Sequence, residues 1–261
     1  MPEALFPTGG VAFVGAGPGD PELLTVKAAR LIGQADLVLY AGSLVPQGVV
    51  ALARAGAQVV DSSPLSLDQT HALLVATVRQ GGLAARVHTG DPSLYGAVSE
   101  QIRLLVADGI PYTVVPGVTS AAAAAAAFGV SFTEPEATQT LILTRQAGRT
   151  PMPPGESLAE LARHGASMAV YLSAGDPEGV ARALAEGGLP GETPVAVAHR
   201  LGWPGEKRRL ATIDTLAQTV RAEGMDRQTV FLVLPGLGRG TTSKLYDSSF
   251  AHGFRPARED D

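Results

Sequence analysis

Short apolar runs alternate with stretches of helical periodicity through the first half of the 261-residue chain. Buried strands are predicted at Val11–Gly15, Asp36–Tyr40, Val59–Val60, Ala84–His88 and Tyr112–Val115. Asp20 and Pro21 are a favourable cap and first residue for a helix that we expect to continue to Gly33. Further helical patterns fall near residues 68–80 and 95–107. This order of elements favours a parallel sheet with right-handed crossovers.

Pro116-Gly117 interrupts the pattern, and we place a domain boundary there, giving domains 1–117 and 118–261. After a helix opening at Ala121–Ala127, strands are predicted at Gln139–Thr144, Ser167–Leu172, Val195–Ala198 and Thr229–Leu234, and helices near 156–164, 177–187 and 214–223. Lys207–Ala211 suggests an added antiparallel edge. The expected fold class is therefore α/β, with a mostly parallel N-terminal sheet and a mixed C-terminal sheet. The charged tail Ala257–Asp261 is predicted to fray.

Composition narrows the functional classes. Hydrophobic residues make up 45% and charged residues 17%, which is globular composition. With a net charge of −5 and one short basic run, Lys207–Arg209, no nucleic-acid partner is expected. There is no Cys and the five His are scattered, so we expect no protein-bound metal. The N-terminus lacks a signal-peptide pattern, and prolines interrupt the one long uncharged stretch, Ile110–Thr133, so no membrane association and a cytoplasmic location are expected.

Three loops that follow or connect predicted strands carry the candidate chemistry. Gly15-Ala-Gly-Pro-Gly-Asp20 lies between a strand and a helix, but Pro18 removes a backbone donor and Asp20 adds a negative charge, so the loop is poorly suited to phosphate. Thr89-Gly-Asp-Pro-Ser-Leu-Tyr-Gly96 brings a carboxylate to the carboxyl edge of the same sheet. Pro116-Gly-Val-Thr-Ser120 precedes seven alanines and offers hydroxyls at a helix start. Purely structural roles remain open: a tight turn, an N-cap at Asp91 and an Ala-rich packing helix.

These three motifs, in this order and spacing, resemble the tetrapyrrole (corrin/porphyrin) methylase family over Gly10 to Arg255. Four further stretches resemble the subgroup that methylates carbon 11 of precorrin-4 or cobalt-precorrin-4. They are Tyr40–Val45, His88–Ala97, Thr144–Pro153 and Ser243–Arg255. The resemblance implies a two-domain enzyme of cobalamin biosynthesis that binds S-adenosyl-L-methionine in a cleft between its domains and forms a homodimer.

The resemblance also implies the site residues. Those expected to bind the methyl donor are Pro18, Gly90, Asp91, Leu94, Thr119, Ser120, Leu172 and Leu201. Leu172 stands where the family often has Met. Asp91 and Glu100 are the catalytic candidates, Glu100 as a proton acceptor, although related uroporphyrinogen methylases carry an arginine where this chain has Ala97.

Arg145 and Arg149 are suited to bidentate contacts with the substrate's carboxylates, and Tyr95 is a further substrate-binding candidate. A surface role for Glu100 and for the arginine pair stays open. So do methylation at another ring carbon, a nicotinamide-dependent oxidoreductase and a non-catalytic tetrapyrrole carrier.

Overall fold

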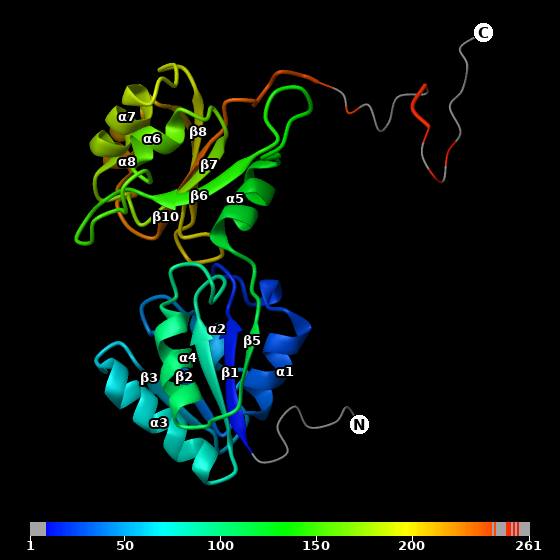
Figure 1. The fold of residues 1–261 in the computed structure, drawn as a ribbon, viewed down its shortest axis with the longest axis vertical. Coiled ribbons are helices and arrows are strands. Elements are labelled where there is room, and N and C mark those ends of the chain that lie inside the picture. Colours follow the sequence, from blue (N-terminus) through cyan, green and yellow to red (C-terminus); the bar gives the residue numbers. More distant parts are fainter. Residues whose placement is uncertain (1–8, 242, 244–248, 252, 254, 256–261) are drawn as a thin grey trace. The chain divides into compact units, whose positions relative to one another are not determined.

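The computed structural model describes residues 9–241, 243, 249–251, 253 and 255 (Figure 1). The tail predicted to fray lies outside these residues. Contacts divide the chain into two compact units. The first contains Met1–Ala123 together with Arg200–Glu206, and the second contains Ala124–His199 and Lys207–Asp261.

The first unit contains a five-stranded parallel sheet. Its strands are β1 (Gly10–Gly15), β2 (Leu37–Tyr40), β3 (Gln58–Asp61), β4 (Leu83–His88) and β5 (Tyr112–Val115), in the spatial order β3-β2-β4-β1-β5. Because β4, β1 and β5 are neighbours and parallel, the loops that follow them emerge side by side at one edge. The parallel sheet predicted for this part of the chain is confirmed.

Helices cover both faces of this sheet (Figure 1). One hydrophobic cluster joins α1 (Val26–Gln34) and α2 (Gln47–Val50) to the sheet through Ile32 and Val49, among others. A second cluster on the opposite face joins α3 (Leu67–Arg79) and α4 (Val98–Ala107) to it through Leu74 and Leu105. Every residue of β1 is buried, as expected for a central strand of a parallel sheet covered on both faces.

The helix predicted from Asp20 to Gly33 is not continuous. Asp20 caps only a 3-10 turn over Pro21–Leu23, and its side chain accepts from the Glu22 amide. Leu24 and Thr25 are then extended, and the Thr25 hydroxyl accepts from the Ala28 amide at 3.1 Å to start α1. The prediction was wrong because the chain has two successive capping residues, Asp20 and Thr25, and the second one sets the helix start.

The second unit contains a mixed sheet, as predicted. Its strands are β6 (Leu141–Arg145), β7 (Ser167–Tyr171), β8 (Pro194–His199), β9 (Lys207–Thr212) and β10 (Thr229–Val233), in the order β6-β7-β10-β8-β9. Only β6 and β7 pair in parallel. The predicted antiparallel edge at Lys207–Ala211 is present as β9.

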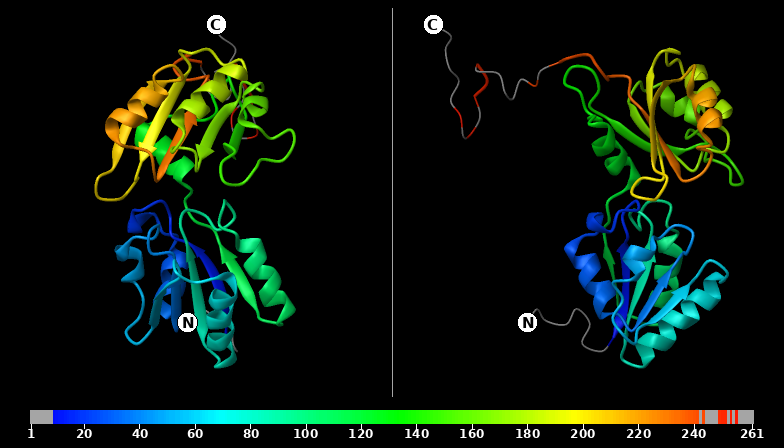
Figure 2. Two further views of the ribbon diagram at one scale, coloured as in Figure 1. Left: turned by 90° about the vertical axis from the view of Figure 1, so that its left-hand side faces the viewer. Right: turned by 180° about the vertical axis from the view of Figure 1, so that it is seen from behind.

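One face of the second sheet packs on three helices, α6 (Leu158–Ala162), α7 (Pro177–Glu186) and α8 (Leu216–Glu223), which lie together in Figure 2. Phe231, Met168 and Leu184 are among the largest fully buried side chains of this core. The Ala-rich helix α5 (Ser120–Phe128) lies in the chain where the first unit gives way to the second.

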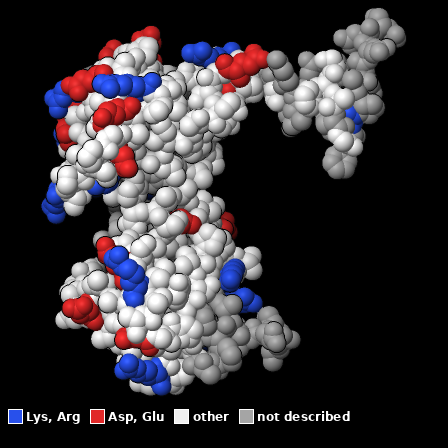
Figure 3. All heavy atoms as spheres, in the orientation of Figure 1, with Lys and Arg blue, Asp and Glu red and all other residues white. Residues whose placement is uncertain are grey.

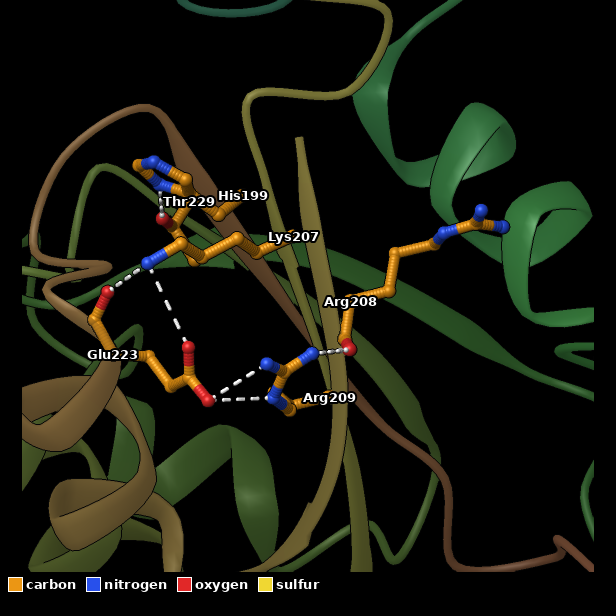
Figure 4. A network of polar contacts seen from close by, with 6 residues as sticks. All are labelled: His199, Lys207, Arg208, Arg209, Glu223 and Thr229. Atoms are coloured by element: carbon orange, nitrogen blue, oxygen red, sulfur yellow. Dashed lines mark hydrogen bonds and ion pairs between the residues drawn. The ribbon is translucent and has the colours of Figure 1, made fainter. Parts of the chain in front are cut away.

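The short basic run in β9 is held mainly by one acidic residue of α8 (Figure 4). Glu223 lies 2.7 Å from an Arg209 guanidinium nitrogen, and its backbone carbonyl accepts from Lys207 Nζ at 2.6 Å. Arg208 points away from Glu223 and donates to the Ala127 carbonyl at 2.7 Å. On the face drawn in Figure 3, cationic and anionic side chains are interspersed. The run therefore serves local ion pairs and helix contacts.

Candidate active site

Three loops meet at the carboxyl edge of the first sheet. They follow β1, β4 and β5 and contain the three motifs Gly15–Asp20, Thr89–Gly96 and Pro116–Ser120. Gly17 and Gly90 exchange backbone hydrogen bonds, with Gly90 donating to the Gly17 carbonyl at 2.7 Å and Gly17 donating to the Gly90 carbonyl at 3.3 Å. The first two motifs are thus joined by main-chain atoms.

The third motif approaches the other two through glycine backbone. A Cβ on Gly15 would lie 2.5 Å from the Gly90 carbonyl oxygen and 2.6 Å from Gly117 Cα. A Cβ on Gly117 would lie 2.1 Å from the same Gly90 oxygen. No side chain fits at either position, because real Cβ atoms do not come within 3.0 Å of such neighbours. The three glycines therefore let three loops converge at distances that other residues would prevent.

Asp91 ties the second loop to the third. Its Oδ2 accepts from the Gly117 amide at 3.0 Å, and its Oδ1 accepts from the Ser93 amide at 2.8 Å and from the Ser93 hydroxyl. Burial alone would raise the pKa of this carboxyl, but the hydrogen bonds from Ser93 and Gly117 outweigh it, and the pKa is lowered. Asp91 is therefore a fixed negative charge at neutral pH, and Oδ2 keeps one acceptor position beyond these contacts.

The end of the second loop has an unusual backbone. Tyr95 and Ala97 have φ values of 57° and 48°, the left-handed region that non-glycine residues seldom occupy. The helix predicted near 95–107 consequently starts only at Val98. Tyr95 is 46% exposed, and Glu100 lies exposed in the first turn of α4. Such strained residues concentrate at functional sites, which agrees with a binding role for this loop.

A turn from much later in the chain packs on the first loop. Leu201 is buried, and its carbonyl oxygen lies where a Cβ on Gly19 would come within 2.3 Å. Trp203 Nε1 donates to the Pro18 carbonyl at 3.0 Å. Leu201 was among the site residues predicted from the sequence, whereas Trp203 was not. Its signal was that it is the single Trp of the sequence and stands between Gly202 and Pro204 in a turn-forming stretch.

Two basic residues of β4, the half-buried Arg86 and the buried His88, lie beneath these loops. The pKa of His88 is lowered to about 3, chiefly by burial and also by the nearby charge of Arg86, while the charge of Asp91 partly offsets these two effects. Among the described residues, His88 Nε2 has no hydrogen-bond partner. Arg86 donates to Ser62 Oγ at 2.9 Å and to Gln101 Oε1 at 3.1 Å. His88 is therefore neutral near pH 7, and Arg86 is held by neutral acceptors.

The other predicted site residues belong to the second unit. Arg145 ends β6, and its guanidinium donates to the carbonyls of Gln146, Thr150 and Pro151 at 2.9–3.1 Å. Arg149 is exposed in the loop so held. Leu172 directly follows β7, is 74% exposed and has a φ of 55°. Backbone strain of this kind is concentrated at functional sites.

Of the predicted donor-binding residues, those from the first unit gather at one edge of its sheet. They are Pro18, Gly90, Asp91, Leu94, Thr119, Ser120 and Leu201. The described residues contain no group of three or more His, Cys, Asp or Glu side chains arranged to hold a metal ion. Across the same described part of the chain, no helix combines the length and apolar character needed to cross a bilayer.

The sequence matches the family Tetrapyrrole (Corrin/Porphyrin) Methylases over residues 10–217, a range that includes all three motifs and the Trp203 turn. The chain belongs to this family.

Comparison with individual members of the family gives more detail than the family match. The chain is 47% identical to a precorrin-4 C(11)-methyltransferase of Pseudomonas aeruginosa, over 94% of this chain and 98% of that protein. It is similar to the X-ray structure of a cobalt precorrin-4 methyltransferase, with a TM-score of 0.85 and 41% identity over 88% of this chain and 98% of that one. A Thermus thermophilus uroporphyrin-III C-methyl transferase, solved with S-adenyl homocysteine, matches with a TM-score of 0.70 and 30% identity, over 85% of this chain and 91% of that one.

Proposed function

We propose that this protein transfers a methyl group from S-adenosyl-L-methionine to carbon 11 of precorrin-4 or cobalt-precorrin-4, in cobalamin biosynthesis. The observation that carries the proposal is the convergence of three glycine-containing loops at one sheet edge. It occurs in a chain that is 47% identical to a relative named for this reaction. The relatives named for precorrin-4 share 47% and 41% sequence identity with this chain, whereas the relative named for uroporphyrin-III shares 30%, which favours carbon 11 over a different ring carbon.

The residues of the loops suit a cationic methyl donor. The donor supplies a methyl group on a positively charged sulfur, which is reactive toward an electron-rich carbon. Asp91 stays ionised and keeps one acceptor position, which suits the ammonium group of the donor's amino-acid portion. Gly90 permits close backbone approach, and Pro18 and Leu94 offer apolar contact. Thr119, Ser120 and Leu201 complete the set that we assign to donor binding.

The protein's part in the reaction is chiefly alignment. Holding donor and acceptor in line replaces a bimolecular encounter by a step within one complex, and enclosure excludes competing water. Because the positive charge on sulfur disappears during transfer, a site that bound the sulfonium strongly would not raise turnover. A protein contact to the amino-acid portion of the donor, away from the sulfur, binds the donor without binding the sulfonium itself strongly. We assign proton acceptance to Glu100, which is exposed and so accessible to a substrate.

We assign recognition of the anionic macrocycle to Arg145, Arg149 and Tyr95. The carbonyl contacts of Arg145 fix the loop that carries Arg149, whose guanidinium then presents a fork suited to carboxylates. Leu172 offers an apolar contact to the donor. The proposal further includes a cytoplasmic homodimer without a protein-bound metal. Its support is the family resemblance and, for the metal, the absence of Cys from the sequence.

A labelled-methyl experiment tests this function. The protein is incubated with carbon-13-labelled S-adenosyl-L-methionine and either metal-free or cobalt-containing precorrin-4, and NMR locates the new methyl group. The proposal expects the label at carbon 11, and the ratio of kcat/KM for the two substrates identifies the preferred one. A label at another ring carbon would overturn the regiochemistry. No transfer, beside undiminished binding of the tetrapyrrole, would overturn the enzymatic function.

A further inference from the structure

The single tryptophan of the sequence is hydrogen-bonded to the glycine loop that follows β1. Its Nε1–H donates to the Pro18 carbonyl at 3.0 Å, although 185 residues separate the two positions. A Cβ on Gly19 would come within 2.3 Å of Trp203 Cδ1. The indole ring thus lies directly against Gly19, where only a glycine leaves room for it.

The turn that carries Trp203 is itself well braced. The Trp203 amide donates to the Arg200 carbonyl at 2.9 Å, and the Glu206 amide donates to the Trp203 carbonyl at 3.0 Å. The Gly202 amide donates to Glu206 Oε2 at 2.8 Å. The Arg200 guanidinium carbon lies 5.9 Å from the centre of the indole ring, within the range of a cation–π contact. The indole is therefore presented by a rigid support.

The conformation of the glycine loop, Gly15–Asp20, depends on hydrogen bonds from outside the loop. Pro18 has no N–H, so this residue has only its carbonyl for a backbone hydrogen bond, and the Trp203 indole donates to that carbonyl. On the other side, Gly17 is held by its backbone exchange with Gly90. The segment that carries Pro18 is thus fixed at Gly17 by the second loop and at Pro18 by Trp203.

We propose that Trp203 is a positioning residue for the methyl donor: its indole N–H holds the Pro18 peptide in the conformation that the donor requires. The residue acts through the loop and does not touch the reacting atoms. Losing the N–H lets the Pro18 segment sample other conformations, so the donor must order it on binding. The effect falls on donor affinity, while transfer from the filled site keeps its rate. This inference rests on the proposed function, since it assigns the loop to the donor.

The test is Trp203→Phe, which keeps an aromatic ring against Gly19 and removes the N–H. The dissociation constant for S-adenosylhomocysteine, measured by calorimetry, and the KM for S-adenosyl-L-methionine are expected to rise about fivefold, the effect of one ordinary hydrogen bond. At saturating donor, kcat and the KM for the tetrapyrrole stay within about twofold of wild type.

The matched control is Thr77→Val. It removes a hydrogen bond of the same length, from the Thr77 hydroxyl to the Leu73 carbonyl at 3.0 Å. Thr77 lies in the last turns of α3, next to the start of β4, at the opposite edge of the same sheet. The Thr77→Val variant should bind S-adenosylhomocysteine as tightly as wild type, even if Thr77→Val and Trp203→Phe lower the free energy of unfolding by similar amounts.

Three outcomes would overturn the inference. Trp203→Phe could bind S-adenosylhomocysteine as tightly as wild type, or it could lose kcat and tetrapyrrole affinity to the same extent as donor affinity. Because Trp203 is the only tryptophan, titrating the wild-type protein by tryptophan fluorescence gives a reading even if the variant does not fold. A saturable change in emission with the calorimetric dissociation constant supports the inference, and unchanged emission during binding refutes it. If wild type itself bound no S-adenosylhomocysteine, the proposed function would fail with it.

Discussion

Replacing Gly117 by alanine tests whether glycine packing shapes the donor site. The added Cβ would lie 2.1 Å from the Gly90 carbonyl oxygen and 2.8 Å from Gly15 Cα, both of them backbone atoms in separate loops. Ordinary contact begins near 3.4 Å, so the loops must move apart by more than 1 Å. Overpacking of this kind costs about 1–3 kcal/mol of the free energy of unfolding.

The same movement disturbs function, because the Gly117 amide is the group that donates to Asp91 Oδ2 at 3.0 Å. A displacement of roughly 1 Å at a reacting site can lower the rate about 100-fold. Gly117→Ala is therefore expected to lower kcat/KM by that order and to weaken S-adenosylhomocysteine binding. Urea denaturation measures the stability, calorimetry the ligand affinity, and methyl transfer to precorrin-4 the activity.

Gly33→Ala provides the matched control within the same unit. Gly33 lies in α1 with an ordinary φ, and an added Cβ would meet only the Leu52 carbonyl oxygen at 3.4 Å. Alanine in a helix interior is about 0.5–1 kcal/mol more favourable than glycine, so this variant should be at least as stable as wild type and fully active. If Gly117→Ala also kept wild-type affinity and turnover, the glycine contacts would not be what forms the site.

The position of the three loops could be predicted from the sequence, because it follows from local pattern and topology together. Apolar runs ending at Gly15, His88 and Val115 indicated strands, and their alternation with helices indicated a parallel sheet. Carboxyl ends of parallel strands share an edge, so the loops had to emerge on the same side. What the pattern did not contain was the neighbour order β4-β1-β5, which brings Gly15, Gly90 and Gly117 into contact.

The features that were predicted wrongly or not at all have physical causes of two kinds. The first kind is competition between two nearby capping residues. Asp20 and Thr25 both cap a helical segment, and only Thr25 starts α1, so the helix predicted from Asp20 is interrupted. The second kind is contact between distant parts of the chain. Trp203 was not predicted as a site residue because its partner Pro18 lies 185 residues away, and sequence periodicity carries no information about contacts at that separation. The roles of Arg145 and Asp91 were predicted in part. Their residue types suggested binding of charged groups of the ligands, and the structure shows in addition that both side chains hydrogen-bond to loop backbone and hold it in place.

Two further predictions concern charged groups. Arg145→Ala should lower tetrapyrrole kcat/KM about tenfold or more while S-adenosylhomocysteine affinity, measured by calorimetry, stays at the wild-type value; an equal fall in both would mean that Arg145 serves the fold alone. His88→Gln should reduce the pH dependence of stability. Because the pKa of buried His88 is about 3 and its ordinary value is 6.5, the unfolded chain binds a proton between these values that the folded chain does not. The free energy of unfolding of wild type therefore falls as pH drops below about 6.5, by about 2 kcal/mol at pH 5 from this group. Urea denaturation at pH 7 and pH 5 should show that difference disappear in His88→Gln and persist in the control His164→Gln, which alters an exposed histidine. Equal pH dependence in wild type and His88→Gln would show that His88 is protonated in the folded protein as readily as in the unfolded chain.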